Sequence, residues 1–109
     1  MAKSSKKDRN IPSKIKIGCF NYSVIKNNNM MSNEIGQTKV DKLVIELNPI
    51  FPDEILRETL LHECLHAILN DTFIIDDEVE EKIIRVLSPK IMQMMEDNKD
   101  LVDFLFKKI

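Results

Sequence analysis

The stretch PDEILRETLLHECLHAILND, residues 52–71, decides the fold of this 109-residue chain. Apolar residues recur on several sides of residues 55–69, as expected of a central helix that packs on more than one face. Pro52 and two acidic residues precede this run, and the helix dipole favours acidic residues in a first turn. Asn70 and Asp71 end the apolar run. The stretch therefore predicts one long helix around which the rest of the chain packs.

Two segments before this helix have the composition of β-strands. Residues 15–25 are rich in β-branched and aromatic residues. The spacing of their apolar residues changes at Gly18-Cys19, which predicts a strand with a bulge at that point. Residues 43–47, LVIEL, predict a second strand that Asn48-Pro49 closes. Residues 30–37 match neither a helix nor a strand pattern.

Two further helices are predicted after residue 71. The first begins at about Asp77, and Pro89 inside it predicts either a kink or the start of a new helix, because proline lacks an N–H. A polar break at residues 97–100 precedes a short terminal helix over residues 101–108. The inner face of the longer helix is expected to consist of its apolar residues, which are Val79, Ile83, Ile84, Val86, Leu87, Ile91 and Met94.

The order of these elements predicts an α+β fold, with a small antiparallel sheet of two to three strands followed by two to three helices. Hydrophobic residues make up 43% of the chain and charged residues 31%, which is the composition of a globular domain rather than a disordered chain. We expect residues 1–12 to form a disordered basic arm and residues 13–109 to form a single domain.

Charge is distributed unevenly along the chain. Residues 1–16 contain six basic residues and one acidic residue, whereas residues 53–109 contain seven basic and fourteen acidic residues. A basic arm can bind nucleic acid, but no aromatic or helical recognition pattern accompanies this one, so nucleic acid is not an expected partner. No apolar run approaches the roughly 18 residues that a membrane span needs. We therefore expect a cytoplasmic protein without a membrane partner.

The two histidines of the chain, His62 and His66, stand one helical turn apart. Residues four apart share a helix face, so both imidazoles can bind one cation. Glu63 projects about 100° round the helix from His62, beside the cation rather than on it. A base in that position can take a proton from a water that the metal activates. The segment HECLH matches the HExxH pattern, so it predicts Zn²⁺ as cofactor and Glu63 as catalytic base.

A catalytic zinc site has three protein ligands and an open position, so one further ligand must come from elsewhere in the chain. The acidic cluster at residues 76–81 opens the next helix. On a helical wheel Glu80 falls near the middle of the apolar face, where a carboxylate is costly unless it is paired or binds a cation. We therefore predict Glu80 as the third ligand, with Glu81, at the margin of that face, as the alternative.

The segment TLLHECLHAIL, residues 59–69, followed by an acidic helix start, resembles small zinc-peptidase-like proteins of phages and prophages related to the ImmA/IrrE metallopeptidases. The short strand pair of Gly36-Gln37-Thr38 and residues 43–48 resembles the front half of these proteins, and residues 91–98 resemble their C-terminal helix. The resemblance implies a minimal zincin-like domain with a gluzincin site, made of two histidines, a downstream glutamate and the motif glutamate as base. It also implies cleavage of a repressor or regulatory protein.

These observations lead to one main hypothesis and one alternative. The main hypothesis is a zinc-dependent endopeptidase that acts on a protein substrate, with residues 43–47 as a candidate edge strand on which the substrate lies. The alternative is a non-catalytic metal-binding interaction module of a phage or prophage. Three protein ligands and an open position favour catalysis, whereas a fourth side chain that closes the site favours a structural role. The residues alone do not identify an oxyanion donor, for which Tyr22, Arg57 and Arg85 are the candidates.

Overall fold

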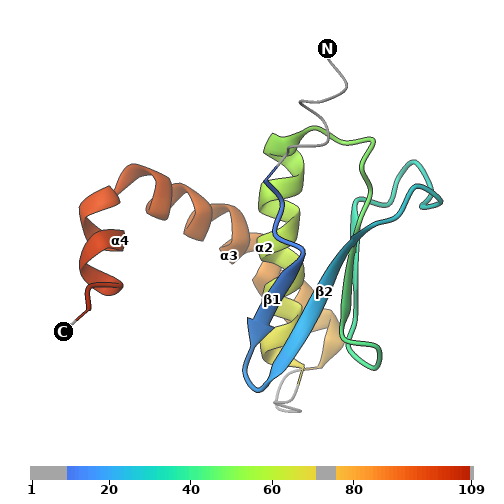
Figure 1. Ribbon diagram of the computed structural model, residues 1–109, viewed down its shortest axis with the longest axis horizontal. Helices are drawn as coiled ribbons and strands as arrows, with labels where there is room; N and C mark the ends of the chain where they lie inside the picture. Colours follow the sequence, from blue (N-terminus) through green and yellow to red (C-terminus); the bar gives the residue numbers. More distant parts are fainter. Residues whose placement is uncertain (1–9, 71–75, 109) are drawn as a thin grey trace.

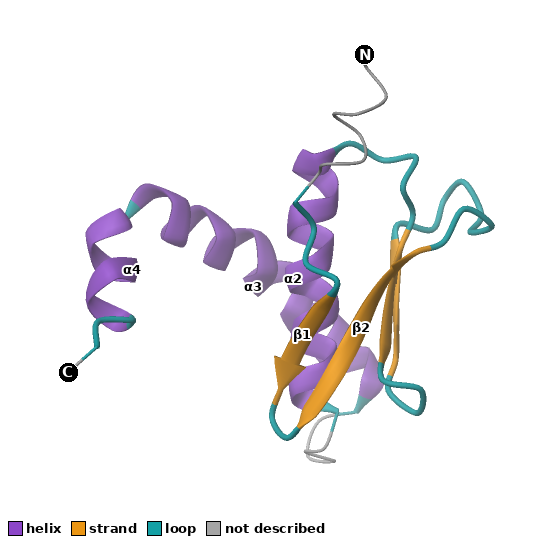
Figure 2. Cartoon of the chain, viewed as in Figure 1, coloured by secondary structure: helices purple, strands orange, loops and turns teal. Residues whose placement is uncertain are grey.

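The structure is a computed structural model that describes residues 10–70 and 76–108, and in it a sheet packs against a long helix (Figure 1). Four strands come first in the chain and three helices follow (Figure 2), which confirms the predicted α+β fold class. The elements are β1 (Lys14–Ile17), β2 (Phe20–Lys26), β3 (Gly36–Lys39), β4 (Val44–Leu47), α2 (Asp53–Leu69), α3 (Asp77–Asp97) and α4 (Lys99–Leu105).

The sheet has the strand order β1-β2-β4-β3. β1 pairs antiparallel with β2, and β3 pairs antiparallel with β4, but β4 runs parallel to β2. The sheet therefore differs from the predicted one by a fourth strand and by one parallel pair. The sequence gives little sign of β3, because this strand is only four residues long, GQTK, and lacks the apolar alternation of a half-buried strand.

A tight turn at Gly18-Cys19 separates β1 from β2, where the sequence predicted one strand with a bulge. Gly18 has a φ of 62°. A two-residue hairpin turn needs this left-handed backbone, and glycine adopts it without a steric penalty. Ile17 and Phe20 pair across the turn. The change in apolar spacing at this point thus marks a hairpin rather than a bulge.

The buried residue Asn48 ties the loop before β3 to the end of β4. Its side-chain amide donates hydrogen bonds to the carbonyl oxygens of Met31 and Glu34, at 3.2 and 2.8 Å. Its backbone N–H donates to the carbonyl of Ile35 at 2.8 Å. These bonds fix the loop that leads into β3, so that this short edge strand is held in contact with α2.

The helix α2 lies between the sheet and α3. It contacts β1, β3 and β4 as well as α3 (Figure 1). Ala67 packs in the core with Tyr22 of β2 and Ile45 of β4, and Leu56 is 1% exposed. Packing against two neighbours explains why apolar residues occupy several sides of this helix.

The helix α3 runs without a break from Asp77 to Asp97, so Pro89 lies inside one helix rather than at the start of another. Ser88 is fully buried, and its hydroxyl donates a hydrogen bond to the carboxylate of Glu58 on α2. The inner face of α3 is narrower than predicted, because α3 contacts α2 and α4 but none of the strands. Ile84 is buried as expected, but five of the predicted inner residues are exposed: Val79, Ile83, Val86, Leu87 and Met94.

The short helix α4 lies at the far end of α3, away from the sheet (Figure 1), and α3 is the element it contacts in the described part of the chain. None of its residues is buried. The described helices include none that is both long and apolar enough to cross a membrane. Residues 1–9 of the predicted basic arm lie outside the described residues, so that arm and the single-domain boundaries stay predictions.

Candidate metal site

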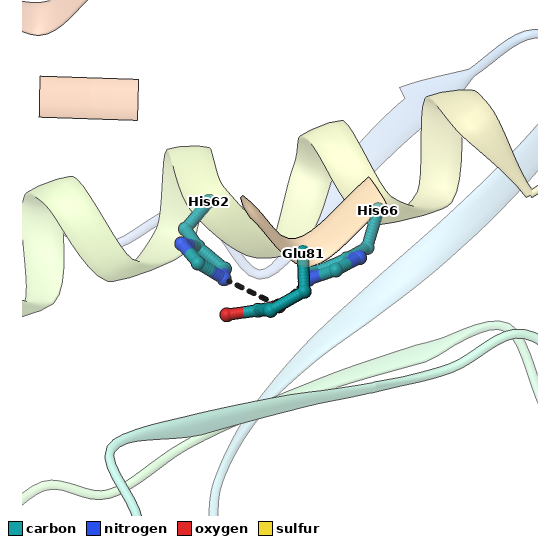
Figure 3. A group of neighbouring side chains, drawn as sticks. All are labelled: His62, His66 and Glu81. Atoms are coloured by element: carbon teal, nitrogen blue, oxygen red, sulfur yellow. Dashed lines mark hydrogen bonds and ion pairs between the residues drawn. The ribbon is translucent and has the colours of Figure 1, made fainter. Parts of the chain in front are cut away.

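The two histidines lie on the same face of α2. Figure 3 shows both imidazole rings on one side of the helix, with Glu81 between them, and the ring centroids are 5.0 Å apart. Both side chains are partly shielded from solvent, with 18% exposure for His62 and 23% for His66. The spacing of four residues along the helix produces this arrangement.

Glu81 of α3 brings a carboxylate to both rings. Its Oε1 atom lies 2.7 Å from Nε2 of His66 and 3.4 Å from Nε2 of His62. One possible ligand atom from each of the three residues lies within 4.8 Å of the other two. Tetrahedral zinc, with bonds of about 2.0–2.2 Å, separates its ligand atoms by roughly 3.4 Å. The three side chains could therefore hold such an ion with only small adjustments.

Glu80, the predicted third ligand, contacts a different part of His66. Its Oε2 atom lies 2.7 Å from Nδ1 of His66, on the opposite edge of the ring from Glu81. Successive helix residues project about 100° apart, so these two neighbouring carboxylates reach the imidazole from different directions. The structure thus groups Glu81, and not Glu80, with the two Nε2 atoms. Glu80 instead has the position of an outer carboxylate. Such a carboxylate binds the ring nitrogen of a histidine that does not face the metal and so orients the ring.

The surroundings of His66 favour its protonated form. Burial alone would lower the pKa of His66, but its hydrogen bonds with Glu80 and Glu81 and the nearby charge of Glu63 outweigh burial and raise that pKa above its ordinary value. Zinc binds neutral imidazole, so a metal ion would replace the proton at Nε2 while Glu80 keeps its bond to Nδ1.

Glu81 is held in its ionised form by its neighbours. Burial would raise the pKa of Glu81, but its hydrogen bonds with Arg85 and His66 and the charges of the two histidines lower that pKa overall. The Arg85 guanidinium donates to Oε2 of Glu81 at 3.0 Å, one helical turn further along α3. A carboxylate that is already ionised needs no deprotonation before it binds a cation.

Glu63, the predicted catalytic base, lies beside this cluster in a nearly buried position, with 8% exposure. Its Oε1 atom accepts a hydrogen bond from the hydroxyl of Thr38 on β3 at 2.7 Å. The neighbouring Cys64 is directed elsewhere, since it packs against the core that contains Ala67. Burial and the charge of Glu63 raise the pKa of the Cys64 thiol to about 11, so this thiol is protonated at neutral pH in the metal-free protein.

Two hollows meet at Gly36 and Glu63, between the β3 side of the sheet and the helices. One, of about 320 Å³, is lined in part by Thr38, His66 and Glu80. The other, of about 490 Å³, is lined in part by His62, Glu81 and Arg85. Glu63 and the candidate metal cluster therefore line one open groove, made of these two adjoining hollows, beside the edge strand β3.

The strand beside the groove is not the one that the sequence singled out. Residues 43–47 were the candidate edge strand, but β4, which contains most of them, lies between β2 and β3. Both sides of β4 are already paired, so it cannot accept another strand. The two edge strands of the sheet are β1 and β3, and β3 (Gly36–Lys39) is the one that lines the hollow beside the cluster.

The three candidate oxyanion donors occupy different surroundings. Tyr22 is 4% exposed and packs in the core with Ile45, outside the residues that line the groove. Arg57 pairs with Glu96 on the exposed side of the helix pair. Arg85 lines the groove and binds Glu81, so it alone of the three is near the cluster.

Comparison with known proteins gives no relative, because no protein family, no curated protein and no solved structure matches this chain. The resemblance to the ImmA/IrrE group therefore stays a prediction.

Thr38 and Arg85 are parts of the site whose roles the sequence did not reveal. Arg85 follows Glu81 by four residues, a spacing at which an ion pair is expected on a helix. Gly36 and Thr38 are two apart on a strand, so both face the same side. In the structure this side of β3 faces Glu63, so both residues contact the site, which their spacing alone does not indicate.

Proposed function

We propose that this protein is a zinc-dependent peptidase that hydrolyses a protein substrate, with His62, His66 and Glu81 as the metal ligands. The observation that carries the proposal is the convergence of two imidazoles and one carboxylate within 4.8 Å, with the carboxylate of Glu63 next to them in an open groove. Two histidines and a glutamate with a fourth position left for solvent or substrate form a common ligand set of zinc peptidases.

The proposed chemistry divides between the metal and the chain. A bound zinc ion would act as a Lewis acid that makes water nucleophilic near neutral pH and polarises the substrate carbonyl. Glu63 would take the proton from the attacking water and deliver it to the leaving amine. Glu80 would keep His66 in the orientation that directs Nε2 towards the metal.

The substrate would bind as an extended peptide along β3. The open backbone edge of Gly36–Lys39 can add a strand through main-chain hydrogen bonds, which give affinity without a deep pocket. Beyond one end of the groove, Val40 and Asn70 also line a cavity of about 650 Å³, whose other walls include Phe20 and Leu43. An apolar substrate side chain near the scissile bond would fit there. A cytoplasmic repressor or regulatory protein remains the proposed substrate class.

The test combines metal analysis with proteolysis. Purified protein should contain one zinc ion per chain and should cleave an unfolded protein in a manner that a chelator abolishes and added zinc restores. Glu63→Gln should keep the zinc but lower kcat by about 10²- to 10⁴-fold, the range that a general base contributes. Zinc content would be measured by elemental analysis and cleavage by mass spectrometry.

Three outcomes are informative here. Full cleavage by Glu63→Gln would refute the role of Glu63. Zinc bound without any cleavage would support the non-catalytic metal-binding module instead. The absence of zinc and of any other transition metal from the purified protein, even after incubation with zinc, would refute both.

A further inference from the structure

The strand β3 approaches α2 unusually closely at Gly36. A Cβ atom added to Gly36 would lie 2.7 Å from Cγ2 of Thr59 and 3.4 Å from Cγ of Glu63. It would also lie 3.2 Å from the carbonyl oxygen of Glu46 on the neighbouring strand. The first distance is shorter than carbon atoms tolerate, so a side chain at position 36 would push β3 away from α2. Glycine at this position is therefore what lets the strand lie against Glu63.

Thr38, two residues later and on the same side of β3, uses this close approach. Its hydroxyl lies 2.7 Å from the carboxylate oxygen Oε1 of Glu63 and 3.0 Å from the carbonyl oxygen of the same residue. The hydroxyl has one proton, and the charged carboxylate is the stronger acceptor. A short side chain from the edge strand thus contacts both the main chain and the side chain of Glu63.

We propose that Thr38 is a positioning residue that fixes the carboxylate of Glu63 for proton transfer. The inference rests on the proposed function for its kinetic consequence, but the contact itself exists without a metal. The hydrogen bond engages Oε1, and no bond to Oε2 is seen in the described residues. Oε2 is then the oxygen of Glu63 that remains for proton exchange with the attacking water and the leaving amine. Glu63 lines both hollows of the groove in which the substrate is proposed to bind.

The position of Thr38 gives this contact its importance. Thr38 belongs to the strand on which the substrate is proposed to lie, so one element would hold both the peptide and the base. Glu63 is 8% exposed, and its hydrogen bond to Thr38 fixes the rotation of the carboxylate about its last bond, which the reaction geometry requires. The edge strand, and not the helix that carries Glu63, would thus set the distance between the base and the scissile bond.

The kinetic test compares Thr38→Val, which keeps the shape but removes the hydroxyl, with Thr38→Ser, which keeps the hydroxyl. With zinc bound, Thr38→Val should lower kcat by about 10- to 100-fold, the range found when outer-shell partners at metal sites are removed. KM and the zinc content should stay the same. Thr38→Ser should keep most of the wild-type kcat. In a Glu63→Gln background, adding Thr38→Val should lower kcat no further.

A second measurement uses metal-free protein and needs no activity. The denaturant midpoint would be determined for Thr38→Val in the wild-type and in the Glu63→Ala background. If the hydroxyl binds the carboxylate, the midpoint should fall clearly in the wild type and much less when the carboxylate is absent.

These two experiments separate the inference from the proposed function. Wild-type kcat in Thr38→Val, or a loss that Thr38→Ser does not repair, would overturn the positioning role. Equal midpoint shifts in the two backgrounds would overturn the contact itself. If wild-type protein with zinc cleaves nothing, the proposed function fails and the kinetic role of Thr38 fails with it. The midpoint comparison still decides whether Thr38 holds Glu63.

Discussion

His66 has a carboxylate on each of its two ring nitrogens, Glu80 at Nδ1 and Glu81 at Nε2, both at 2.7 Å. A ring in this setting can be an imidazolium that donates two hydrogen bonds, or a neutral ligand that keeps one donor and offers the other nitrogen to a metal. If the ring is a neutral metal ligand, the two adjacent carboxylates have different functions: Glu81 would bind the metal and Glu80 would orient the ring. This difference can be tested by mutation.

Replacement of Glu81 should weaken metal binding more than replacement of Glu80. Glu81→Gln removes a charged ligand, so zinc affinity should fall by more than 100-fold, whereas Glu80→Gln keeps a side chain that can accept from Nδ1 and should cost about 10- to 100-fold or less. Competition with a chromogenic chelator would measure both affinities. Glu78→Gln, on an exposed side chain of the same helix, is the control. The reverse order of the two losses would mean that Glu80 is the ligand.

The sequence alone does not predict which of these two glutamates is the third metal ligand. A helical wheel shows which residues face the neighbouring helix, and it correctly directs attention to Glu80 as a carboxylate on the inner side of α3. It does not show which edge of an imidazole each carboxylate meets, because that depends on how far α3 is rotated and shifted along α2. His62, Glu63 and His66 needed no such information, since all three lie on one helix.

Glu46 on β4 offers a pH test that is separate from the metal cluster. Its hydrogen bond to Lys39 on β3, at 3.1 Å, is the main cause that lowers the pKa of Glu46 below its ordinary value. A carboxylate with a lowered folded-state pKa stabilises the protein above its unfolded-state pKa, and that stabilisation is lost as the pH falls through the folded-state pKa. Glu46→Gln should therefore cost about 1 kcal/mol in unfolding free energy near neutral pH.

Urea denaturation at about pH 7 and about pH 3 would measure this effect. The difference in unfolding free energy between the variant and the wild type should be smaller at the lower pH than at the higher one. A difference that is equally large in acid would show that Glu46 acts through packing and not through its charge.

At the scale of elements, the site depends on how β3 and α2 meet. The sequence predicted the bounds of α2 and the start of α3 closely, because a long apolar run and an acidic first turn are strong local signals. The terminal helix was predicted over residues 101–108, but α4 begins at Lys99 and ends at Leu105. The residue pattern of β3 did not predict a strand, and only the family resemblance suggested one at residues 36–38, because the contacts that hold this strand come from residues far away, such as Asn48 and Glu63. The four residues of a strand that is held by distant partners need not show the alternation of apolar and polar residues that predicts a strand.

Gly36→Ala should separate β3 from α2. The added methyl group collides with Thr59, and such overpacking costs about 1–3 kcal/mol in unfolding free energy. Because Thr38 moves with the strand, kcat for peptide cleavage should fall as well. Thr59→Ser, which removes the colliding methyl group, should recover part of both losses in the double variant.

Gly18→Ala is the matched control for this experiment. A Cβ at Gly18 meets no atom within 4 Å, but the positive φ makes alanine unfavourable there, so stability should fall without any displacement of β3. Chemical denaturation and the kinetics of peptide cleavage would be measured for the wild type, Gly36→Ala, Gly36→Ala with Thr59→Ser, and Gly18→Ala. An equal loss of kcat in Gly18→Ala and Gly36→Ala would attribute the effect to general destabilisation.

At the scale of the whole molecule, the candidate metal cluster joins α2 and α3, which otherwise meet along a narrow face of α3. His62 and His66 belong to α2 and Glu81 belongs to α3. The order of elements was enough to predict an α+β chain, but the direction of β4 and the narrow contact of α3 were not predictable. Both depend on the path of the loops between the elements and on which surfaces are already occupied.

Zinc should therefore stabilise the folded chain as a whole. If zinc binds only the folded state, a free concentration of 100 times Kd raises the unfolding free energy by about 2.7 kcal/mol. Denaturant unfolding with zinc and with a chelator would measure the difference, with His66→Ala as the control that should show none. An equal stabilisation of His66→Ala would place the responsible zinc ion elsewhere on the protein.

Pro89 has a mechanical consequence for this arrangement. Proline provides no N–H, so the carbonyl of Arg85 lacks the usual helical partner four residues on, and α3 has a weak point one turn beyond Glu81. Ser88, next to it, is anchored to Glu58 on α2. Bending of the distal part of α3, which carries α4, would be absorbed at this hinge. The turn that carries Glu81 would thereby be insulated from movements of α4.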